Sequence, residues 1–351
     1  MNGWNFEYIE NREEYQKLFE NIMTREQETN VEFLEENIKR FIDRKYVVAV
    51  NSGTDALHFA LLSHNIKKGD EVLVSNFSWV STASCISMVG ATPVFCDIDI
   101  NSYHMSLESI KNMYSEKTKA IVYPHLFGNM SDTKEIIQFC KEKNIIFIED
   151  ACQSLGSSLD GINAGTIGDC STLSFNANKV IAGISGGGAF LTDDIEKANI
   201  VRKLRRHGNH EMLGYNSKML LFNAEVINYR LKKLHYYMAK RQAIAMAYDR
   251  ELKFLPVKTQ TLSQNQNHNY HKYVIRFEDK ETRNKIREKL NLNVHYDKPI
   301  SDNLMYRNIH HRKDLDLVTA KVCDTILSLP IHPWLKEEEL RKIVNSIVLL
   351  A

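Results

Sequence analysis

One lysine in a glycine-rich segment is the residue of this chain most suited to covalent chemistry. Lys179 stands in the stretch SFNANKVIAGISGGGAF, residues 174–190, which also holds Gly183, Gly186, Gly187 and Gly188. An unprotonated lysine amine attacks carbonyl carbons, and partial burial or nearby positive charge favours that state. Glycines beside it let a flat ring or a phosphate approach the backbone closely. The segment predicts a lysine that tethers a carbonyl compound; a surface lysine before a glycine turn is the alternative.

A carboxylate precedes this lysine by 29 residues. The run IIFIED, residues 145–150, predicts a hydrophobic strand that ends on Glu149 and Asp150. In sheets of parallel strands, ligands bind beyond the carboxyl ends of the strands. Asp150 is therefore placed to pair with a ring nitrogen, keep it protonated and make the ring an electron sink. An aspartate that only caps the next turn is the alternative.

A phosphate site is indicated where SGTDAL, residues 52–57, follows a strand and opens a helix. The first-turn amides of Gly53 and Thr54 lack intrahelical acceptors, and the Thr54 hydroxyl adds a further donor, so this end suits a phosphate. Ser174, five residues before the lysine, can add another contact. An ordinary helix N-cap at Ser52 or Thr54 is the alternative.

An aromatic residue completes the set of groups. Trp79 follows the predicted strand 71–75, where an indole can stack on a flat ring, although a core tryptophan is the alternative. Taken together, these residues would anchor a phosphate, stack a ring, pair the ring nitrogen and tether an aldehyde. Pyridoxal 5′-phosphate (PLP) requires those four functions, so the sequence predicts PLP as cofactor.

The elements that must position these residues alternate over the first two-thirds of the chain. Short apolar strands between helices predict a mostly parallel sheet with helices on both faces. Beyond residue 195 the pattern turns helical and basic, and an α+β tail follows. We place a boundary near residue 235, which gives a large domain, 1–235, and a small one, 236–351. The individual expectations are strands at 46–50, 71–75, 92–99, 119–124, 145–150 and 273–277, helices at 132–143 and 280–290, and a surface loop at 261–269.

Composition excludes several classes of protein. Lys and Arg number 45 and Asp and Glu 44, a net charge of +1, so no nucleic-acid partner is expected. No apolar run approaches the roughly 20 residues of a membrane helix, and the first residues do not form a signal peptide. The six cysteines form no C-x-x-C pair and have no histidine at zinc spacing, so we expect no metal site and a reduced, cytoplasmic protein.

With these motifs the chain resembles a known family, the DegT/DnrJ/EryC1/StrS sugar aminotransferases, which are PLP enzymes of fold type I. The resemblance implies a mostly parallel sheet flanked by helices in a large domain, with a smaller α+β C-terminal domain. It spans about residues 45 to 335 and is carried by VNSGTDALHFAL (50–61), SNFSWVSTASCISMVGATPVFCDID (75–99), PHLFGNMSD (124–132), FIEDACQSLGSSLDGINAGTIGDCSTLSF (147–175), the Lys179 segment, INYRL (227–231) and LSLPIHPWL (327–335).

The resemblance also implies a role for individual residues. Lys179 and Asp150 would be the catalytic pair, as Schiff-base lysine and partner of the pyridine nitrogen. Asn228 would reach the phosphate from the neighbouring subunit, which implies a homodimer with shared sites. Arg230 and His125 are the candidates for substrate contacts. The other cofactor contacts would be Gln153 beside the ring, Trp79 stacked on it, and Gly53, Thr54 and Ser174 at the phosphate.

Two residues depart from the family pattern near the lysine. Gly186 stands where relatives usually carry Glu or Asp, and Val180 where they usually carry Asn. Neither change removes a reacting group, but both bear on the shape of the loop and on the choice of substrate.

The activity implied is ping-pong transamination from L-glutamate to a nucleotide-linked keto-6-deoxysugar, with a 4-keto group favoured over a 3-keto group. The amino sugar would enter surface polysaccharide, such as lipopolysaccharide O-antigen, or another glycoconjugate. The alternatives are an amino-cyclitol aminotransferase or a sugar dehydratase of the same fold. Some dehydratase relatives replace the lysine with histidine, and Lys179 argues against that branch. An alternative of another class is a non-catalytic PLP-fold sensor or regulator.

Overall fold

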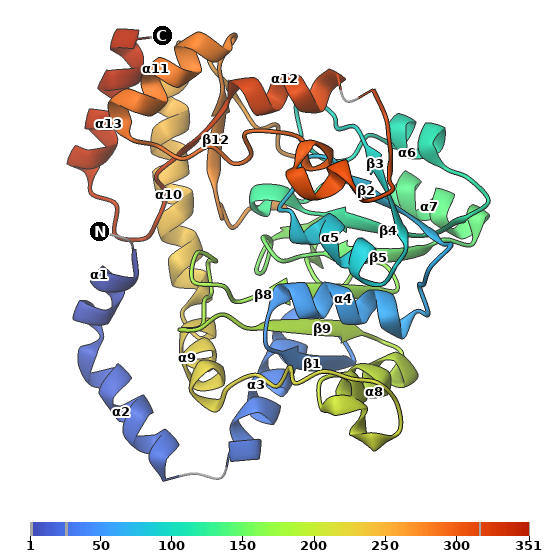
Figure 1. Cartoon of the computed structure of the whole chain (residues 1–351). Coiled ribbons are helices and arrows are strands. Elements are labelled where there is room, and N and C mark those ends of the chain that lie inside the picture. Colours follow the sequence, from blue (N-terminus) through green and yellow to red (C-terminus); the bar gives the residue numbers. More distant parts are fainter. Residues whose placement is uncertain (1–2, 25–26, 316, 351) are drawn as a thin grey trace.

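A central sheet of eight strands organises the protein. The structure is a computed structural model that describes residues 3–24, 27–315 and 317–350 (Figure 1). The sheet has the order β1-β9-β8-β5-β4-β2-β3-β13, and only β9 runs against the direction of the other strands described. Its strands are β1 (Tyr46–Val50), β2 (Glu71–Ser75), β3 (Thr92–Cys96), β4 (Thr118–Pro124), β5 (Ile146–Asp150), β8 (Cys170–Ser174), β9 (Gly188–Thr192) and β13 (Arg312–Lys313).

Helices surround this sheet, and two small sheets lie beside it. One small sheet joins β10 (Lys258–Thr259), β12 (Tyr273–Arg276) and β14 (Ile326–Leu329); the other joins β11 (Gln266–Asn267), β6 (Ser158–Leu159) and β7 (Ile162–Asn163). The helices are α1 (Gly3–Glu10), α2 (Arg12–Met23), α3 (Gln27–Ile42), α4 (Gly53–Ser63), α5 (Ser81–Met88), α6 (Leu107–Met113), α7 (Lys134–Lys143), α8 (Ile195–Leu204), α9 (Leu221–Leu231), α10 (Leu234–Leu252), α11 (Lys280–Leu290), α12 (Leu317–Thr325) and α13 (Glu337–Leu350).

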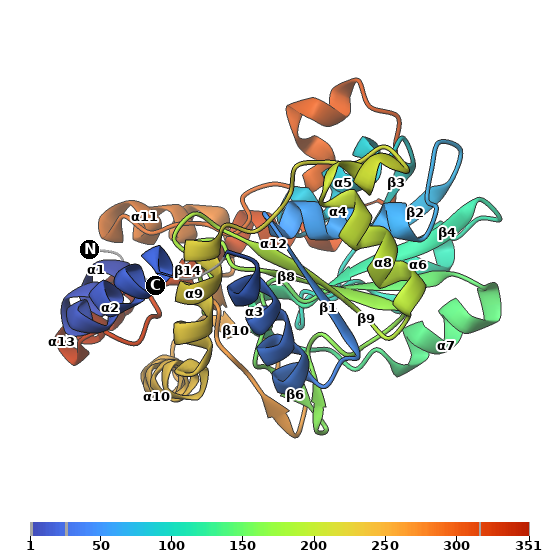
Figure 2. The same ribbon diagram turned by 90° about the horizontal axis from the view of Figure 1, so that it is seen from below.

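The strands are apolar throughout because both faces of the sheet are covered. In β2, Val72 and Val74 pack into the core beneath α4, α5 and α8, whereas Leu73 points to the other core, beneath α6 and α7. Figure 2 shows α4, α5 and α8 on one face and α3 and α7 on the other. A strand buried on both sides needs apolar residues at every position, which is why these segments lack polar alternation. The predicted fold class is confirmed.

A second core begins within helix α10. Residues near its start, such as Tyr237, pack with the large sheet, while Tyr248 and Leu252 pack with β12, β14, α11 and α13. The chain then returns to the large sheet, because β13 adds to the edge of β3. One helix therefore bridges both cores, and the division at residue 235 stays a prediction.

Most predicted elements lie within two residues of their expected bounds, and helix 280–290 matches α11. Two expectations need correction. The strand expected over 92–99 ends at Cys96, after which Asp97 accepts backbone and hydroxyl hydrogen bonds from Thr319. The stretch 261–269 is only partly a surface loop, because β11 pairs with β6, and Asn269 is fully buried and donates to the carbonyls of Gln153 and Leu155. No helix in the described ranges is long and apolar enough to cross a membrane.

The antiparallel strand β9 gives a test of the large core. Phe190 is fully buried, and its backbone pairs with Val48 on one side and Thr172 on the other. Phe190→Ala should lower the free energy of unfolding by about 3–5 kcal/mol, because it removes an aromatic side chain and leaves a cavity. Equilibrium urea unfolding measures the loss. The matched control Phe254→Ala, at a side chain that is 87% exposed, should change it by no more than about 0.5 kcal/mol. Equal effects in both variants would contradict this packing.

Candidate active site

The predicted lysine and aspartate meet at one edge of the sheet because of strand pairing. β5 and β8 are parallel, with Asp150 opposite Thr172, so both strands end at the same edge. After Ser174 the chain forms a loop and returns as the antiparallel strand β9, which pairs Ser174 with Gly188. The whole loop, with Lys179 in it, therefore stays at this edge. Beside it begins helix α4, and together they enclose a cavity of about 380 Å³.

The lysine loop is held by its own backbone and by helix α9. The Lys179 amide donates to the carbonyl of Asn176 at 2.9 Å. From α9, the Asn223 side chain donates to the carbonyl of Gly186 and accepts from the amide of Ser185. Gly186 has φ of 102°, a left-handed conformation that glycine adopts without strain. Gly186, which departs from the family pattern, thus lets the loop turn around the side-chain amide of Asn223.

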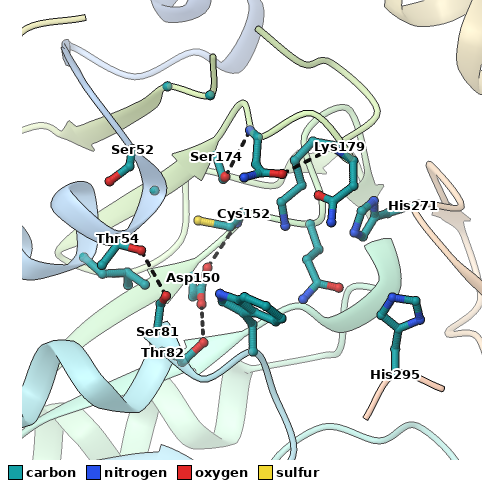
Figure 3. Close-up of a pocket in the computed structure, with 18 of the residues that line it drawn as sticks. Ser52, Thr54, Ser81, Thr82, Asp150, Cys152, Ser174, Lys179, His271 and His295 are labelled. Atoms are coloured by element: carbon teal, nitrogen blue, oxygen red, sulfur yellow. Dashed lines mark hydrogen bonds between the residues drawn. The ribbon is translucent and has the colours of Figure 1, made fainter. Parts of the chain in front are cut away.

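Lys179 lines the cavity and has an environment suited to a nucleophile (Figure 3). Burial lowers the pKa of its ammonium group below the ordinary value of 10.5, and the nearby Cys152 and Asp150 side chains oppose that shift. A lower pKa increases the fraction of free amine near neutral pH, and the free amine is the reactive form.

Asp150 is held in a fixed orientation at the end of β5. Its Oδ2 accepts a hydrogen bond from the Thr82 hydroxyl at 3.0 Å, and its Oδ1 accepts one from the Cys152 amide at 3.2 Å (Figure 3). The side chain lines the cavity and is almost completely buried. A buried carboxylate oriented in this way can bind a cationic N–H of a ligand through a charge-assisted hydrogen bond.

The start of helix α4 forms the opposite part of the cavity. Ser52 is the N-cap, and its hydroxyl accepts from the amide of Asp55 at 3.0 Å, so the N-cap alternative is correct for this residue. The Thr54 hydroxyl donates to Ser81 at 2.9 Å. Gly53 lies so close to Ser174 that a Cβ on it would be 2.7 Å from the Ser174 Cβ. The first-turn amides and Ser174 therefore lie side by side at the wall of the cavity, where an anion can bind to both.

Trp79 and Gln153 also line the cavity. The indole of Trp79 is 58% exposed, so it is not a core tryptophan, and it lies next to the ring of Tyr296. The Gln153 amide is fixed at both ends: its oxygen accepts from the Phe127 amide at 2.9 Å, and its nitrogen donates to the Tyr296 hydroxyl at 3.1 Å.

Three predicted residues do not line this cavity. Asn228 is buried in α9 and accepts from Asn37 at 3.0 Å, while its own Nδ2 has no hydrogen-bond partner among the described residues. Arg230 forms an ion pair with the fully buried Glu7 at 2.8 Å and lines a neighbouring chamber. His125 is fully buried, with Nε2 3.3 Å from a Glu149 carboxylate oxygen. The structure therefore does not bring His125 or Arg230 to the main cavity within this chain.

The C-terminal part of the chain supplies cavity residues that the sequence did not single out. His271, Lys272, His295 and Tyr296 line the same cavity as Lys179. His271 and Lys272 stand immediately before strand β12. A histidine and a lysine at the start of a strand were the feature of the sequence that could have identified them. His295 and Tyr296 lie in a stretch without helix or strand, where local pattern gives no indication of position. Within the described ranges, no three His, Cys, Asp or Glu side chains gather as a metal site would require.

Comparison with protein-family models matches residues 9–348 to the DegT/DnrJ/EryC1/StrS aminotransferase family. A relative from Acidithiobacillus ferrooxidans, UDP-N-acetyl-3-dehydro-alpha-D-glucosamine 3-aminotransferase, is 31% identical over 310 residues, 86% of this chain and 83% of that protein. The pleiotropic regulatory protein of Geobacillus stearothermophilus is 30% identical over 327 residues, 90% of this chain and 88% of that protein.

Solved structures agree with this assignment. S. venezuelae DesV in complex with a ketimine intermediate superposes with a TM-score of 0.93 at 25% identity, covering 98% of this chain and 95% of that one. Bacillus subtilis NtdA with bound cofactor PMP superposes with a TM-score of 0.85 at 26% identity, covering 96% of this chain and 82% of that one.

The lowered pKa of Lys179 predicts its reactivity. In protein freed of small molecules, reductive methylation with formaldehyde should modify Lys179 at pH 8 faster than an exposed lysine such as Lys67 in the same sample. Lys179 should react faster because a lysine of lower pKa keeps a larger free-amine fraction as the pH falls, whereas an ordinary lysine is protonated first. Peptide mapping by mass spectrometry between pH 7 and 10 measures both rates. A Lys179 rate that falls in parallel with that of Lys67 would disprove the shift.

Proposed function

Because the chain belongs to the DegT/DnrJ/EryC1/StrS aminotransferase family, we propose that it transfers an amino group from L-glutamate to a nucleotide-linked keto-6-deoxysugar. Its enzyme class is PLP-dependent sugar aminotransferase. One observation carries the proposal: Lys179 and Asp150 line a single cavity with the start of helix α4. These are the groups that a PLP enzyme needs to tether, polarise and anchor its cofactor.

The residues of the cavity fit PLP. Because Gly53 has no side chain, the first turn of α4 packs directly against Ser174, and the first-turn amides and the Ser174 hydroxyl at the wall of the cavity suit the phosphate. Asp150 would pair with the ring nitrogen, Gln153 would lie beside the ring, and the exposed indole of Trp79 would stack on it. Lys179 would hold the aldehyde. Bound PLP supplies an electron sink for the carbanion that forms when the donor loses its α-proton.

The chain's own groups then handle protons and charge. The Lys179 amine, kept partly unprotonated by burial, can accept the α-proton of the amino donor at Nζ and return it as a general acid. Asp150, fixed by Thr82 and the Cys152 amide, holds a negative charge where a ring cation needs compensation. Trp79 and Tyr296 line the cavity as neighbouring aromatic rings and offer apolar surface to a flat ligand.

The position of the keto group on the acceptor sugar is a further part of what we propose. A 3-aminotransferase is among the relatives, so a 3-keto acceptor stands beside the 4-keto acceptor favoured by the sequence. An amino-cyclitol acceptor stays an alternative. The enzyme class argues against a sugar dehydratase and against a non-catalytic regulator, although one relative is named a pleiotropic regulatory protein. A cytoplasmic location and a role in surface polysaccharide synthesis stay predictions.

We also propose a homodimer with shared sites. Asn228 does not line the cavity of its own chain, yet its Nδ2 is buried without a partner among the described residues. The helix that carries Asn228, α9, contributes Phe222 to a groove of about 760 Å³ that side chains of α1, α2 and the lysine loop also line. A second copy placed there would bring each Asn228 towards the other copy's phosphate site, as the family resemblance implies.

Product analysis tests the proposed function. Purified protein is incubated with PLP, L-glutamate and a panel of nucleotide-linked 4-keto and 3-keto sugars. We expect mass spectrometry to find one amino sugar and an equal amount of 2-oxoglutarate. Lys179→Ala should give neither product and should lack the visible absorbance of the bound cofactor, because it lacks the tethering amine. Product from Lys179→Ala at the wild-type rate would refute the role of the lysine, and no product from any ketosugar would refute the acceptor class.

Subunit mixing tests the shared site. Lys179→Ala and Asn228→Ala are each expected to have low activity alone. If Asn228 serves the neighbouring subunit, a mixed dimer contains one site with both native residues and one with neither. Random reassociation should then restore activity to roughly a quarter of wild type, since about half of the dimers are mixed. A mixture no more active than its components would show that Asn228 does not act across a dimer.

A further inference from the structure

A second chamber adjoins the main cavity on the far side of the lysine loop. It has a volume of about 300 Å³ and shares Lys179, His271 and Lys272 with the main cavity. Arg230 and Arg241 also line it, and no Asp or Glu is among its lining residues in the described part of the chain. A chamber next to the reacting amine that presents cations and no carboxylate is suited to an anionic part of a substrate.

One of these cations is already neutralised. The guanidinium of Arg230 pairs with Glu7 at 2.8 Å and donates to the carbonyl of Ala182 at 3.1 Å. Glu7 in turn accepts hydrogen bonds from the hydroxyls of Tyr15 and Tyr237. Arg230 therefore holds the lysine loop through the carbonyl of Ala182, and the buried Glu7 compensates the charge of the guanidinium. The substrate role expected for Arg230 would require breaking this network.

Arg241 remains uncompensated. It is 7% exposed, and its Nη1 donates to the carbonyls of Tyr270 and Ile331, both at 2.9 Å. Its Nε has no partner, and none of the ion pairs found among the described residues includes it. Burial lowers its pKa to about 10, and the charge of Arg230 adds to that effect. A buried guanidinium without a carboxylate is costly unless an anion approaches it.

Lys272 is the second uncompensated cation, and it borders both spaces. Burial, together with the charges of Arg241 and Lys179, lowers its pKa to about 8. It remains mostly protonated at pH 7. Burial also lowers the pKa of His295 to about 4 and that of His271 well below its ordinary value, so both rings are neutral there. The positive charge available to a ligand beside Lys179 is thus carried by Lys272, with Arg241 behind it.

We propose that Lys272, supported by Arg241, binds a carboxylate of a dicarboxylate amino donor. The inference rests on the proposed function, because it requires the donor's α-carbon to lie at Lys179. In an amino dicarboxylate, both carboxylates lie within a few bonds of that carbon. The diphosphate of a nucleotide sugar is separated from the keto carbon by the sugar ring, so it would not reach a chamber directly beside the lysine. Position relative to the reacting carbon therefore favours the donor.

Binding of glutarate to the PLP-loaded protein tests this without turnover, because glutarate carries both carboxylates but no amine. Calorimetric titration should show at least about tenfold weaker binding to Lys272→Met than to wild type, since a charged hydrogen bond is lost. Lys272→Arg, which keeps the charge, should recover most of the affinity. Lys67→Met, an exposed lysine outside the site, is the matched control and should bind like wild type. Replacing glutarate with its monoamide should weaken binding to wild type and change binding to Lys272→Met little.

The source of the carboxylate is resolved by separating the two half-reactions. Single-turnover reaction with L-glutamate should show a raised half-saturation concentration in Lys272→Met, whereas reaction of the aminated enzyme with a nucleotide-linked ketosugar that has no carboxylate on its ring should be unchanged. Unchanged glutarate affinity in Lys272→Met, with native thermal unfolding and full PLP content, would overturn the proposal. A defect confined to uronate acceptors would overturn it as well. If no ketosugar is aminated but the glutarate result holds, the proposed acceptor fails and the anion site stands.

Discussion

The parallel pairing of β5 and β8 is the constraint on which the site depends. It brings the carboxyl ends of both strands to one edge, so that Asp150 and the loop after Ser174 face the same space. The antiparallel return through β9 keeps the loop at that edge, and helix α4 begins beside it. Three segments far apart in sequence thereby supply an acid, an amine and helix amides without any long excursion of the chain. The chemistry of the site is a consequence of strand direction more than of any one side chain.

Charge balance divides the site into two regions. On one side, Asp150 is the one carboxylate that lines the main cavity among the described residues. Thr82 and a backbone amide hold it, and it faces the space that a cationic ring would occupy. On the side of Lys272, positive groups collect without a carboxylate, apart from Arg230, which Glu7 neutralises. Lys179 lies between the two regions. An amine placed there can meet a cationic ring on one side and a substrate carboxylate on the other, which is the arrangement that transfer between two bound molecules requires.

The part of the site predicted from sequence is the part that lies at element ends. Asp150 closes an apolar run and Gly53 opens a helix, so a local pattern located both, and the family resemblance joined them. His295 and Tyr296 could not be found in this way, because they lie in a stretch without helix or strand and reach the cavity only through tertiary packing. Asn269 was expected on the surface, yet its amide is buried where it holds two carbonyls of the segment after β5. A polar composition predicts exposure only when the tertiary structure offers no buried partners.

Arg230 lies in a motif that was identified from the sequence, but its contacts could not be predicted from that motif. The segment INYRL located the helix and the residue, but its partner Glu7 lies more than two hundred positions earlier, in α1, where the family pattern is not recognisable. A buried ion pair with two tyrosine hydroxyls around the acid connects this candidate substrate contact to the loop that carries the lysine, and its substrate role stays a prediction. Because burying the guanidinium without Glu7 would be unfavourable, α1 and the lysine loop are energetically coupled. In the proposed donor site, Lys272 and Arg241 bind the anion, and both follow Arg230 in the chain, so that this later part could change the substrate while the groups around Lys179 stay the same.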